Sequence, residues 1–245
     1  MENTDAHWKH WGRSDPYRAV LFSDRYKRSR LSDHFQEFFD SGRVYVDSLM
    51  DKIDLLNPSL PRETAVEFGC GVGRLVIPLA RYFRKVIGVD ISPDMLNESR
   101  KNTSLFGVSN VEFLLSDDLV SLVPSGVHLV HSFTVLQHIP VKRGLAICER
   151  LVDRLAPGGA CALHVPVERN LPFAKTVAYS VKHTFPPARY LLNALQGKRF
   201  DEPLMQMNPY PIEAMHEMLL SAGVKDVWIC PLLKSQSVVW FGTKA

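Results

Sequence analysis

A glycine-rich turn between two apolar runs constrains the fold of this 245-residue chain more than any other feature. Residues 66–73 read Val-Glu-Phe-Gly-Cys-Gly-Val-Gly, and the three glycines permit positive φ and leave the backbone open to a ligand. A second apolar run, 85–89, ends at Asp90, where a carboxylate is placed to accept hydrogen bonds from both hydroxyls of a ribose. The pattern predicts a strand, a turn, a helix and a strand around a nucleoside-bearing cofactor.

The spacing of the glycines separates two kinds of cofactor. The dinucleotide fingerprint is G-x-G-x-x-G. Counted from Gly69 the sixth position is Arg74, and counted from Gly71 it is Val76, so neither frame is completed. A nicotinamide or flavin dinucleotide is therefore not the expected cofactor.

Strands alternate with helices along the chain, which predicts a parallel, doubly wound α/β sheet. Residues 1–60 are expected to be helical, and Ser92 is expected to cap a helix that has Pro93 at its first position. Proline-rich residues 166–211 interrupt the pattern with two short helical pieces. The expected strands are 64–68, 86–89, 111–115, 127–131, 160–165, 226–229 and 237–241, and the other expected helices are 73–83, 141–155 and 211–222.

Composition narrows the setting in which such a fold would work. A net charge of +3 is too small to indicate nucleic acid, and 46% hydrophobic residues suffice for a full core. No apolar run has transmembrane length, and residues 1–5 lack the features of a signal peptide. The four cysteines are far apart and indicate reduced residues of a cytoplasmic protein, with no local support for a metal site.

The pattern Glu67-x-Gly69-x-Gly71-x-Gly73 resembles motif I of the class I S-adenosylmethionine (SAM)-dependent methyltransferases. The resemblance implies a seven-stranded Rossmann-like sheet of order 3-2-1-4-5-7-6 with strand 7 antiparallel. It implies SAM as cofactor and S-adenosylhomocysteine (SAH) as product. In this interpretation residues 1–60 form a helical cap, residues 61–245 form the methyltransferase domain, and residues 166–211 form a substrate lid inserted after strand 5.

The same resemblance assigns residues to the cofactor. Acidic residues would hold the ribose and the adenine amino group, and apolar residues would pack on the adenine faces. The first turn and the loop after strand 4 would contact the methionine part. The residues so assigned are Glu67, Gly69, Cys70, Gly71, Asp90, Ile91, Met95, Asp117, Asp118, Leu119, Ser132 and Phe133.

Two of these assignments have structural alternatives. Asp117 is the expected acceptor for the adenine amino group, but it could instead cap the following turn, with Asp118 in either role. From the helical cap, Tyr17 and Arg43 are candidates to contact the methionyl carboxylate, as in one bacterial branch of the family. The alternative for these two is an amphipathic helix packed for stability.

Histidines near the ends of strands 4 and 5 are the candidate catalytic residues. Methyl transfer from a sulfonium has a neutral leaving group, so the protein's main tasks are alignment and exclusion of water. A hydroxyl acceptor also needs a base, and histidine suits that role near neutral pH. His138 is the first candidate and His164 the second, although each could simply bond a backbone carbonyl or help to seat the cofactor.

Absent motifs and local charge limit the acceptor. No Asn/Asp-Pro-Pro-aromatic or Pro-Cys motif follows strand 4, which disfavours methylation of adenine nitrogen and cytosine C5. Six basic residues and no acid lie within 169–200, which leaves the rest of the chain slightly acidic. The sequence therefore favours O-methylation of a small or carrier-linked, anionic acceptor such as a sugar conjugate, by a monomer or homodimer. Alternatives are N- or C-methylation, a catalytically silent SAM-binding protein, RNA or protein methylation, a lid that contacts an acidic membrane surface, and a merely solvated lid.

Overall fold

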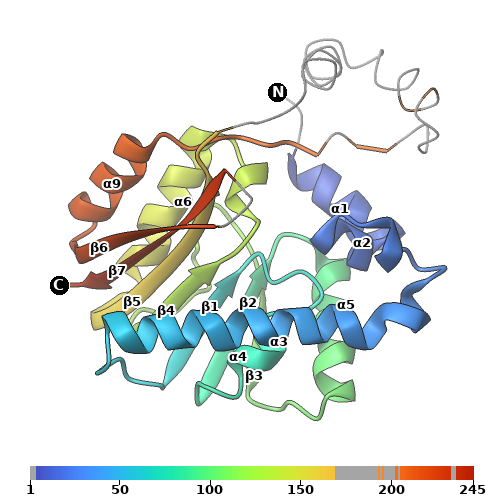
Figure 1. Ribbon diagram of the computed structural model, residues 1–245, viewed down its shortest axis with the longest axis horizontal. Helices are drawn as coiled ribbons and strands as arrows, with labels where there is room; N and C mark the ends of the chain where they lie inside the picture. Colours follow the sequence, from blue (N-terminus) through green and yellow to red (C-terminus); the bar gives the residue numbers. More distant parts are fainter. Residues whose placement is uncertain (1–3, 169–192, 194, 196–201, 204, 233–235) are drawn as a thin grey trace.

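The computed structural model describes residues 4–168, 193, 195, 202–203, 205–232 and 236–245. Its centre is a twisted sheet with helices on both faces and the N-terminal helices at one end (Figure 1). In the described residues the sheet has seven strands in the order β3-β2-β1-β4-β5-β7-β6, with β7 antiparallel to β5 and β6. The order and the single antiparallel strand expected from the resemblance are confirmed.

The strands follow the apolar runs of the sequence. A parallel strand covered on both faces is expected to be buried along its length, and β1 is buried from Ala65 to Phe68, including the polar Glu67. The strands are β1 (Thr64–Phe68), β2 (Lys85–Asp90), β3 (Val111–Leu115), β4 (Val127–Ser132), β5 (Leu155–Pro166), β6 (Val224–Pro231) and β7 (Ser237–Lys244).

Helices cover both faces of the sheet and build the N-terminal cap. Ser92 caps α5 as expected, since its hydroxyl accepts a hydrogen bond from the backbone N–H of Met95 at 3.4 Å. The helices are α1 (Thr4–Ser14), α2 (Pro16–Leu21), α3 (Leu31–Leu56), α4 (Val76–Leu79), α5 (Pro93–Leu105), α6 (Val141–Asp153) and α9 (Ile212–Ser221), and the 3-10 turns are η1 (Asp24–Tyr26) and η2 (Leu136–His138).

Each face of the sheet has its own core. Val66 and Phe68 point to the face covered by α6 and α9, whereas Ala65 points to the face covered by α3 and α4. A third cluster joins the N-terminal helices to α5 through buried aromatic residues that include Trp11, Tyr17 and Phe38. The N-terminal helices are thereby packed beside the carboxyl ends of β1 and β2.

The helix expected over 73–83 is wrong in its length. Only α4, four residues long, is α-helical there. Pro78 has no N–H and so cannot bond the carbonyl of Arg74, four residues earlier. That carbonyl instead lies against Gly42 of α3, where a Cβ would be 2.3 Å from its oxygen. The two short helical pieces expected within 166–211 lie outside the described residues.

Candidate functional site

A cavity lies at the carboxyl ends of β1, β2, β3 and β4, where a doubly wound sheet is expected to bind its ligand. Its floor is the glycine turn after β1, and its walls come from the segments that follow β2, β3 and β4. Helices α1 and α2 of the cap close its open side. The lining includes Thr4, Asp5, Trp8, Val20, Glu67, Gly69, Cys70, Gly71, Arg74, Asp90, Ile91, Met95, Ser116, Asp118, Phe133, Thr134, Val135, Ile139, Arg143 and Ile147.

The glycine turn uses the conformations that its sequence predicts. Gly69, Gly71 and Gly73 have φ values of +76°, +53° and +87°. The backbone N–H groups of Gly69 and Cys70 donate to the carbonyl of Val89 at 2.7 and 3.0 Å, which ties the turn to β2. A Cβ at position 69 would lie 2.2 Å from Cγ2 of Val135, so glycine also lets the loop after β4 approach closely.

Asp90 ends β2 with its carboxylate fixed at the cavity. Oδ2 accepts from the backbone N–H of Gly71 at 2.9 Å, and Oδ1 accepts from that of Ser92 at 2.9 Å. Burial raises the pKa of Asp90 to about 6, although these backbone hydrogen bonds favour the ionised form. The arrangement presents a pre-oriented acceptor beside the glycine turn.

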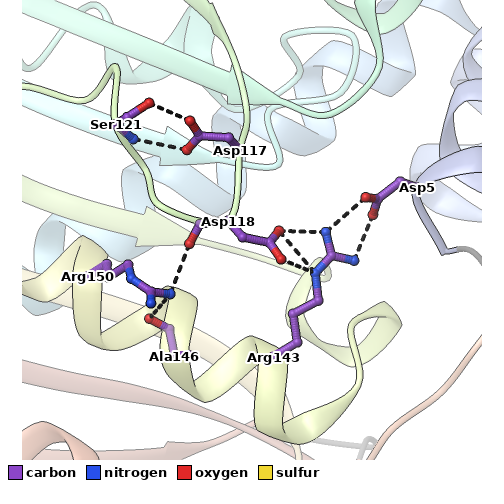
Figure 2. A network of polar contacts seen from close by, with 7 residues as sticks. All are labelled: Asp5, Asp117, Asp118, Ser121, Arg143, Ala146 and Arg150. Carbon is purple, nitrogen blue, oxygen red and sulfur yellow. Dashed lines mark hydrogen bonds and ion pairs between the residues drawn. The ribbon is translucent and has the colours of Figure 1, made fainter.

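Of the two neighbouring acids after β3, Asp118 lines the cavity. The exposed carboxylate of Asp117 turns away and accepts from the backbone N–H of Ser121 at 3.0 Å and from its hydroxyl (Figure 2). Ser121 thereby lowers the pKa of Asp117. Asp117 thus takes the turn-capping alternative, and Leu119 is 61% exposed and outside the lining.

Arg143 of α6 joins the cap to the loop that carries Asp118. Its guanidinium contacts Asp5 of α1 through two parallel hydrogen bonds, Nη1–Oδ1 at 2.7 Å and Nη2–Oδ2 at 2.9 Å. On the other side Nε donates to both oxygens of Asp118, at 3.0 and 2.9 Å (Figure 2). The two carboxylates raise the pKa of Arg143, which stays charged. We call Asp5, Arg143 and Asp118 the clasp.

A buried polar chain lies under the methionine end predicted from the sequence. The carboxylate of Glu67 contacts Nδ1 of His131, and Nε2 of His131 lies 3.0 Å from the hydroxyl of Tyr45. Because a carboxylate only accepts, Nδ1 carries the proton and donates. Glu67 and His131 are 1% and 0% exposed. The ring of Tyr45 packs 4.1 Å from that of Phe133, which lines the cavity.

The two candidate bases, His138 and His164, do not line the cavity at the carboxyl ends of the strands. Nδ1 of His138 donates to the carbonyl of Gln206 at 2.6 Å, Nε2 lies 3.1 Å from the side-chain amide of Gln137, and the ring packs on Trp8. His164 accepts at Nδ1 from the backbone N–H of Thr134 at 3.2 Å. Burial lowers the pKa of each histidine to about 4, so both rings are neutral at pH 7.

Three further predicted contacts also lie away from the cavity lining. Tyr17 is buried among aromatic rings and donates to Asn102 at 3.0 Å. Arg43 is exposed on α3 and pairs with two acids of its own helix, Asp40 and Asp47. The hydroxyl of Ser132 donates to the carbonyl of Phe68 at 3.0 Å. The packing alternative describes the surroundings of Tyr17.

Sequence reasoning missed the lining residues Arg74, Arg143 and Thr134. Arg74 follows the last glycine of the turn directly, which was an available signal. Arg143 is one of many charged residues on helices, and nothing in the sequence distinguished it from the others. Thr134 has φ +60°, a strained conformation for a β-branched residue that typically costs about 1–3 kcal/mol and gathers at functional sites.

Comparison with known proteins matches residues 65–159 to the methyltransferase domain family. The chain is 32% identical to trans-aconitate 2-methyltransferase of Sinorhizobium fredii over 111 residues. This aligned region covers 44% of this chain and 40% of that protein. It is 36% identical to a tRNA/tmRNA (uracil-C(5))-methyltransferase of Nitratiruptor over 104 residues. This second aligned region covers 42% of this chain and 29% of that protein. The chain thus spans two fifths or less of the length of these relatives.

Solved structures resemble this chain over nearly its whole length. The magnesium protoporphyrin IX methyltransferase of Synechocystis with bound SAH gives a TM-score of 0.64 at 17% identity and covers 99% of this chain and 100% of that one. DesVI of Streptomyces venezuelae gives 0.62 at 13% identity over 89% of this chain and 99% of that one. At these identities the likeness concerns the fold. None of the helices in the described residues has the length and hydrophobicity needed to cross a bilayer.

Proposed function

We propose that this chain, which carries a class I SAM-dependent methyltransferase domain, transfers the methyl group of SAM to a small or carrier-linked acceptor. The observation that carries the proposal is the carboxylate of Asp90, held at the cavity by the backbone N–H groups of Gly71 and Ser92. In that position it would accept hydrogen bonds from both ribose hydroxyls of SAM.

The rest of the cavity fits the parts of that cofactor. Ile91 and Met95 offer apolar surface on one side of the adenine position, and Ile139 offers it from the loop after β4. Asp118 supplies an acceptor for the adenine amino group. At the other end, the carboxylate of Glu67 is available to the methionyl ammonium. The positive φ values of the glycine turn keep side chains out of the space between these groups.

The cofactor supplies an activated methyl group when it is bound, and the chain's residues hold, orient and enclose it. Trp8 and Asp5 of α1 line the cavity, and the contact between Arg143 and Asp5 holds α1 in place beside it. Enclosure removes water from the reaction, which strengthens electrostatic interactions inside the site and prevents side reactions. The ring of Phe133 would border the methyl group to be transferred.

An anionic acceptor is proposed from charge alone. All six basic residues between positions 169 and 200 lie outside the described residues, so this part of the proposal rests on the sequence. A local basic excess would attract a phosphorylated or otherwise anionic metabolite to the protein. Oxygen is the proposed acceptor atom.

The experiment that tests the function has two stages. Isothermal titration calorimetry with SAH is expected to show one site per chain, and folded protein that does not bind SAH at millimolar concentration would contradict the proposal. SAM labelled in its methyl group is then offered with pooled sugar phosphates, nucleotide sugars, carrier-linked metabolites and RNA. Label transfer to an anionic small molecule supports the proposed class, whereas transfer to RNA alone rejects it.

Arg143→Gln is expected to increase the rate at which SAH leaves by about three- to tenfold, because it opens the clasp while preserving the fold. The clasp is partly exposed, and exposed ion pairs contribute only about 0.2–1 kcal/mol each, so the melting temperature should change little. Stopped-flow displacement measures the rate. Lys85→Gln, which removes the exposed ion pair with Glu112 on β3, is the control and should leave the rate unchanged. Equal rates in both variants would show that the clasp does not retain the ligand.

His138→Ala is expected to lower turnover by about 100-fold, with unchanged SAH affinity, if His138 is the base for the acceptor hydroxyl. Because burial lowers its pKa to about 4, the rate would then be independent of pH between 6 and 8. The same histidine also makes folding stability depend on pH. The unfolded state takes up a proton near pH 6.5 and the folded state near 4, so stability is lost as pH falls between those values.

Turnover, SAH affinity and the melting temperature are measured together. His34→Ala, on the cap surface beside Glu37, is the matched control for loss of an imidazole. Full turnover of His138→Ala, with a weaker acid dependence of stability, would assign His138 a structural role and leave His164 as the remaining candidate.

A further inference from the structure

Thr134 carries a strained backbone conformation in the loop after β4. It is a β-branched residue with φ +60°, and such a conformation persists only where the surrounding structure enforces it. Strand β4 pairs with β5 as far as Ser132 and Leu163, so Thr134 is the second residue beyond the last pair. Its backbone N–H donates to Nδ1 of His164 at 3.2 Å. A side chain of β5 thus continues the contact between the two strands where their ladder ends.

The left-handed turn determines what the loop presents to the cavity. Along an extended strand successive side chains point to opposite faces, yet Phe133, Thr134 and Val135 all line the cavity. The ring of His164 packs 4.7 Å from that of Phe133. A hydrogen bond from the backbone of Thr134 also partly opposes the lowering of the pKa of His138 by burial. Thr134 therefore lies between the two candidate histidines and is tied to both.

The two histidines carry their protons on different ring nitrogens. A neutral imidazole has one N–H donor and one lone pair. Nδ1 of His164 accepts from Thr134, so its proton is on Nε2 and its lone pair is already used. Nδ1 of His138 donates to the carbonyl of Gln206, which leaves the lone pair on Nε2, 3.1 Å from the side-chain amide of Gln137. His164 can therefore take up a proton only by releasing Thr134, whereas His138 can take one up and keep its bond to Gln206.

The surroundings of His164 keep its ring neutral. The residue is 3% exposed, and burial lowers its pKa to about 4, with a smaller contribution from the nearby His131 and His138. Histidine in water titrates near pH 6.5, so this ring is neutral where an ordinary one would begin to charge. Nδ1 is thereby available to Thr134 over the whole range in which enzymes usually work.

We propose that His164 is a positioning residue and not a second base. Its Nδ1 lone pair holds Thr134 in the left-handed conformation, and Thr134 in turn orders Phe133 and the backbone that contacts His138. The inference rests on the proposed function, because Phe133 would border the methyl group to be transferred. Of the two histidines, only His138 then remains able to accept the proton of the acceptor hydroxyl.

Two substitutions of the same shape isolate the lone pair. Asparagine and leucine branch alike, but only asparagine offers an oxygen at the position of Nδ1. His164→Leu should speed hydrogen exchange of the Thr134 amide at least about tenfold and weaken SAH binding about three- to tenfold, as expected for the loss of one hydrogen bond. His164→Asn, the matched control, should stay within about twofold of wild type in both. Amide exchange followed by NMR and calorimetry with SAH measure the two effects.

Two further measurements separate positioning from proton transfer. In wild-type protein, ¹⁵N NMR of labelled histidine rings should show His164 neutral, with its proton on Nε2, from about pH 5 to pH 8. In the label-transfer assay, His164→Asn should keep turnover within about threefold of wild type, because an amide can accept from Thr134 but cannot serve as a base.

The results that overturn the inference are distinct. A ring proton on Nδ1 of His164 would contradict the assigned hydrogen bond, and equal changes in His164→Leu and His164→Asn would show that the ring matters and the lone pair does not. A loss of turnover of about 100-fold in His164→Asn, with normal amide exchange, would make His164 a base. If His164→Leu does not fold, His164→Asn and the ring spectrum still decide. Wild-type protein that binds no SAH would contradict the proposed function, while amide exchange and the ring spectrum would still test the contact with Thr134.

Discussion

Asp90→Ala is expected to weaken SAH binding by about 100-fold or more. The carboxylate would accept two ribose hydroxyls, and hydrogen bonds to a charged group contribute about 1.5–3 kcal/mol each, so the loss of both exceeds two orders of magnitude. The effect should be large because the backbone N–H groups of Gly71 and Ser92 already orient the acceptor. Calorimetry with SAH measures the change.

Asp117→Ala is the matched control, because it also removes an aspartate that follows a strand. The carboxylate of Asp117 accepts a hydrogen bond from Ser121 and does not line the cavity. Its SAH affinity should stay within about twofold of wild type, on the scale of surface substitutions. Alanine at 90 leaves two N–H groups without their acceptor, so Asp90→Asn provides a second variant of the same shape. Wild-type affinity in Asp90→Asn and Asp90→Ala would remove the ribose contact from the site.

The acidity of Asp90 predicts a pH dependence with opposite signs for binding and folding. Burial raises its pKa to about 6, and the ribose hydroxyls need the ionised acceptor, so SAH affinity should fall as pH decreases below about 6. In the unliganded protein the folded pKa exceeds the unfolded value of 3.8. The ionised carboxylate therefore costs folding stability at neutral pH, and this cost declines as pH falls from about 6 and is absent below the unfolded pKa of 3.8.

Asp90→Asn separates these two effects. Its SAH affinity should be lower than that of wild type at pH 8 and should not change between pH 5.5 and 8. Its unliganded melting temperature should equal or exceed that of wild type at pH 8, because a buried charge has been removed. A wild-type affinity that stays constant down to pH 5 would contradict the prediction, because it requires Asp90 to have the same pKa with and without SAH.

The sequence predicted the parts of the fold that depend on local patterns. Runs of apolar residues marked the strands, and Ser92 with Pro93 marked the start of α5. The glycine turn and Asp90 were placed at the cavity because the turn requires positive φ and the acid ends the next parallel strand. The strand order itself came from the family resemblance.

Contacts between distant segments were beyond such patterns. Asp5 and Arg143 are 138 positions apart, and each resembles any other charged residue on an exposed helix face. The choice between Asp117 and Asp118 depends on how one turn folds back on Ser121. Arg74 follows the glycine turn directly, which was an available signal, but its burial against Ser41 and Gly42 depends on how α3 packs on the turn.

Gly69→Ala is expected to lower the free energy of unfolding by about 2–5 kcal/mol and to weaken SAH binding at least about tenfold. A left-handed alanine costs about 1–2 kcal/mol, and φ at this position is +76°. The new Cβ would also lie 2.2 Å from Cγ2 of Val135, and overpacking of this kind adds about 1–3 kcal/mol. Relief of the clash must displace Val135, which lines the cavity.

Gly107→Ala isolates the backbone cost, because Gly107 has φ +66° and a Cβ there would meet nothing within 4 Å. That control should lose only about 1–2 kcal/mol of stability and should bind SAH as wild type does. Adding Val135→Ala to Gly69→Ala removes the two Cγ atoms nearest to the new methyl group and should recover part of the stability. Urea unfolding and calorimetry measure both quantities. If Gly69→Ala and Gly107→Ala lose equal stability and both bind SAH normally, glycine at 69 serves only the backbone, and the close approach of the β4 loop does not shape the cofactor site.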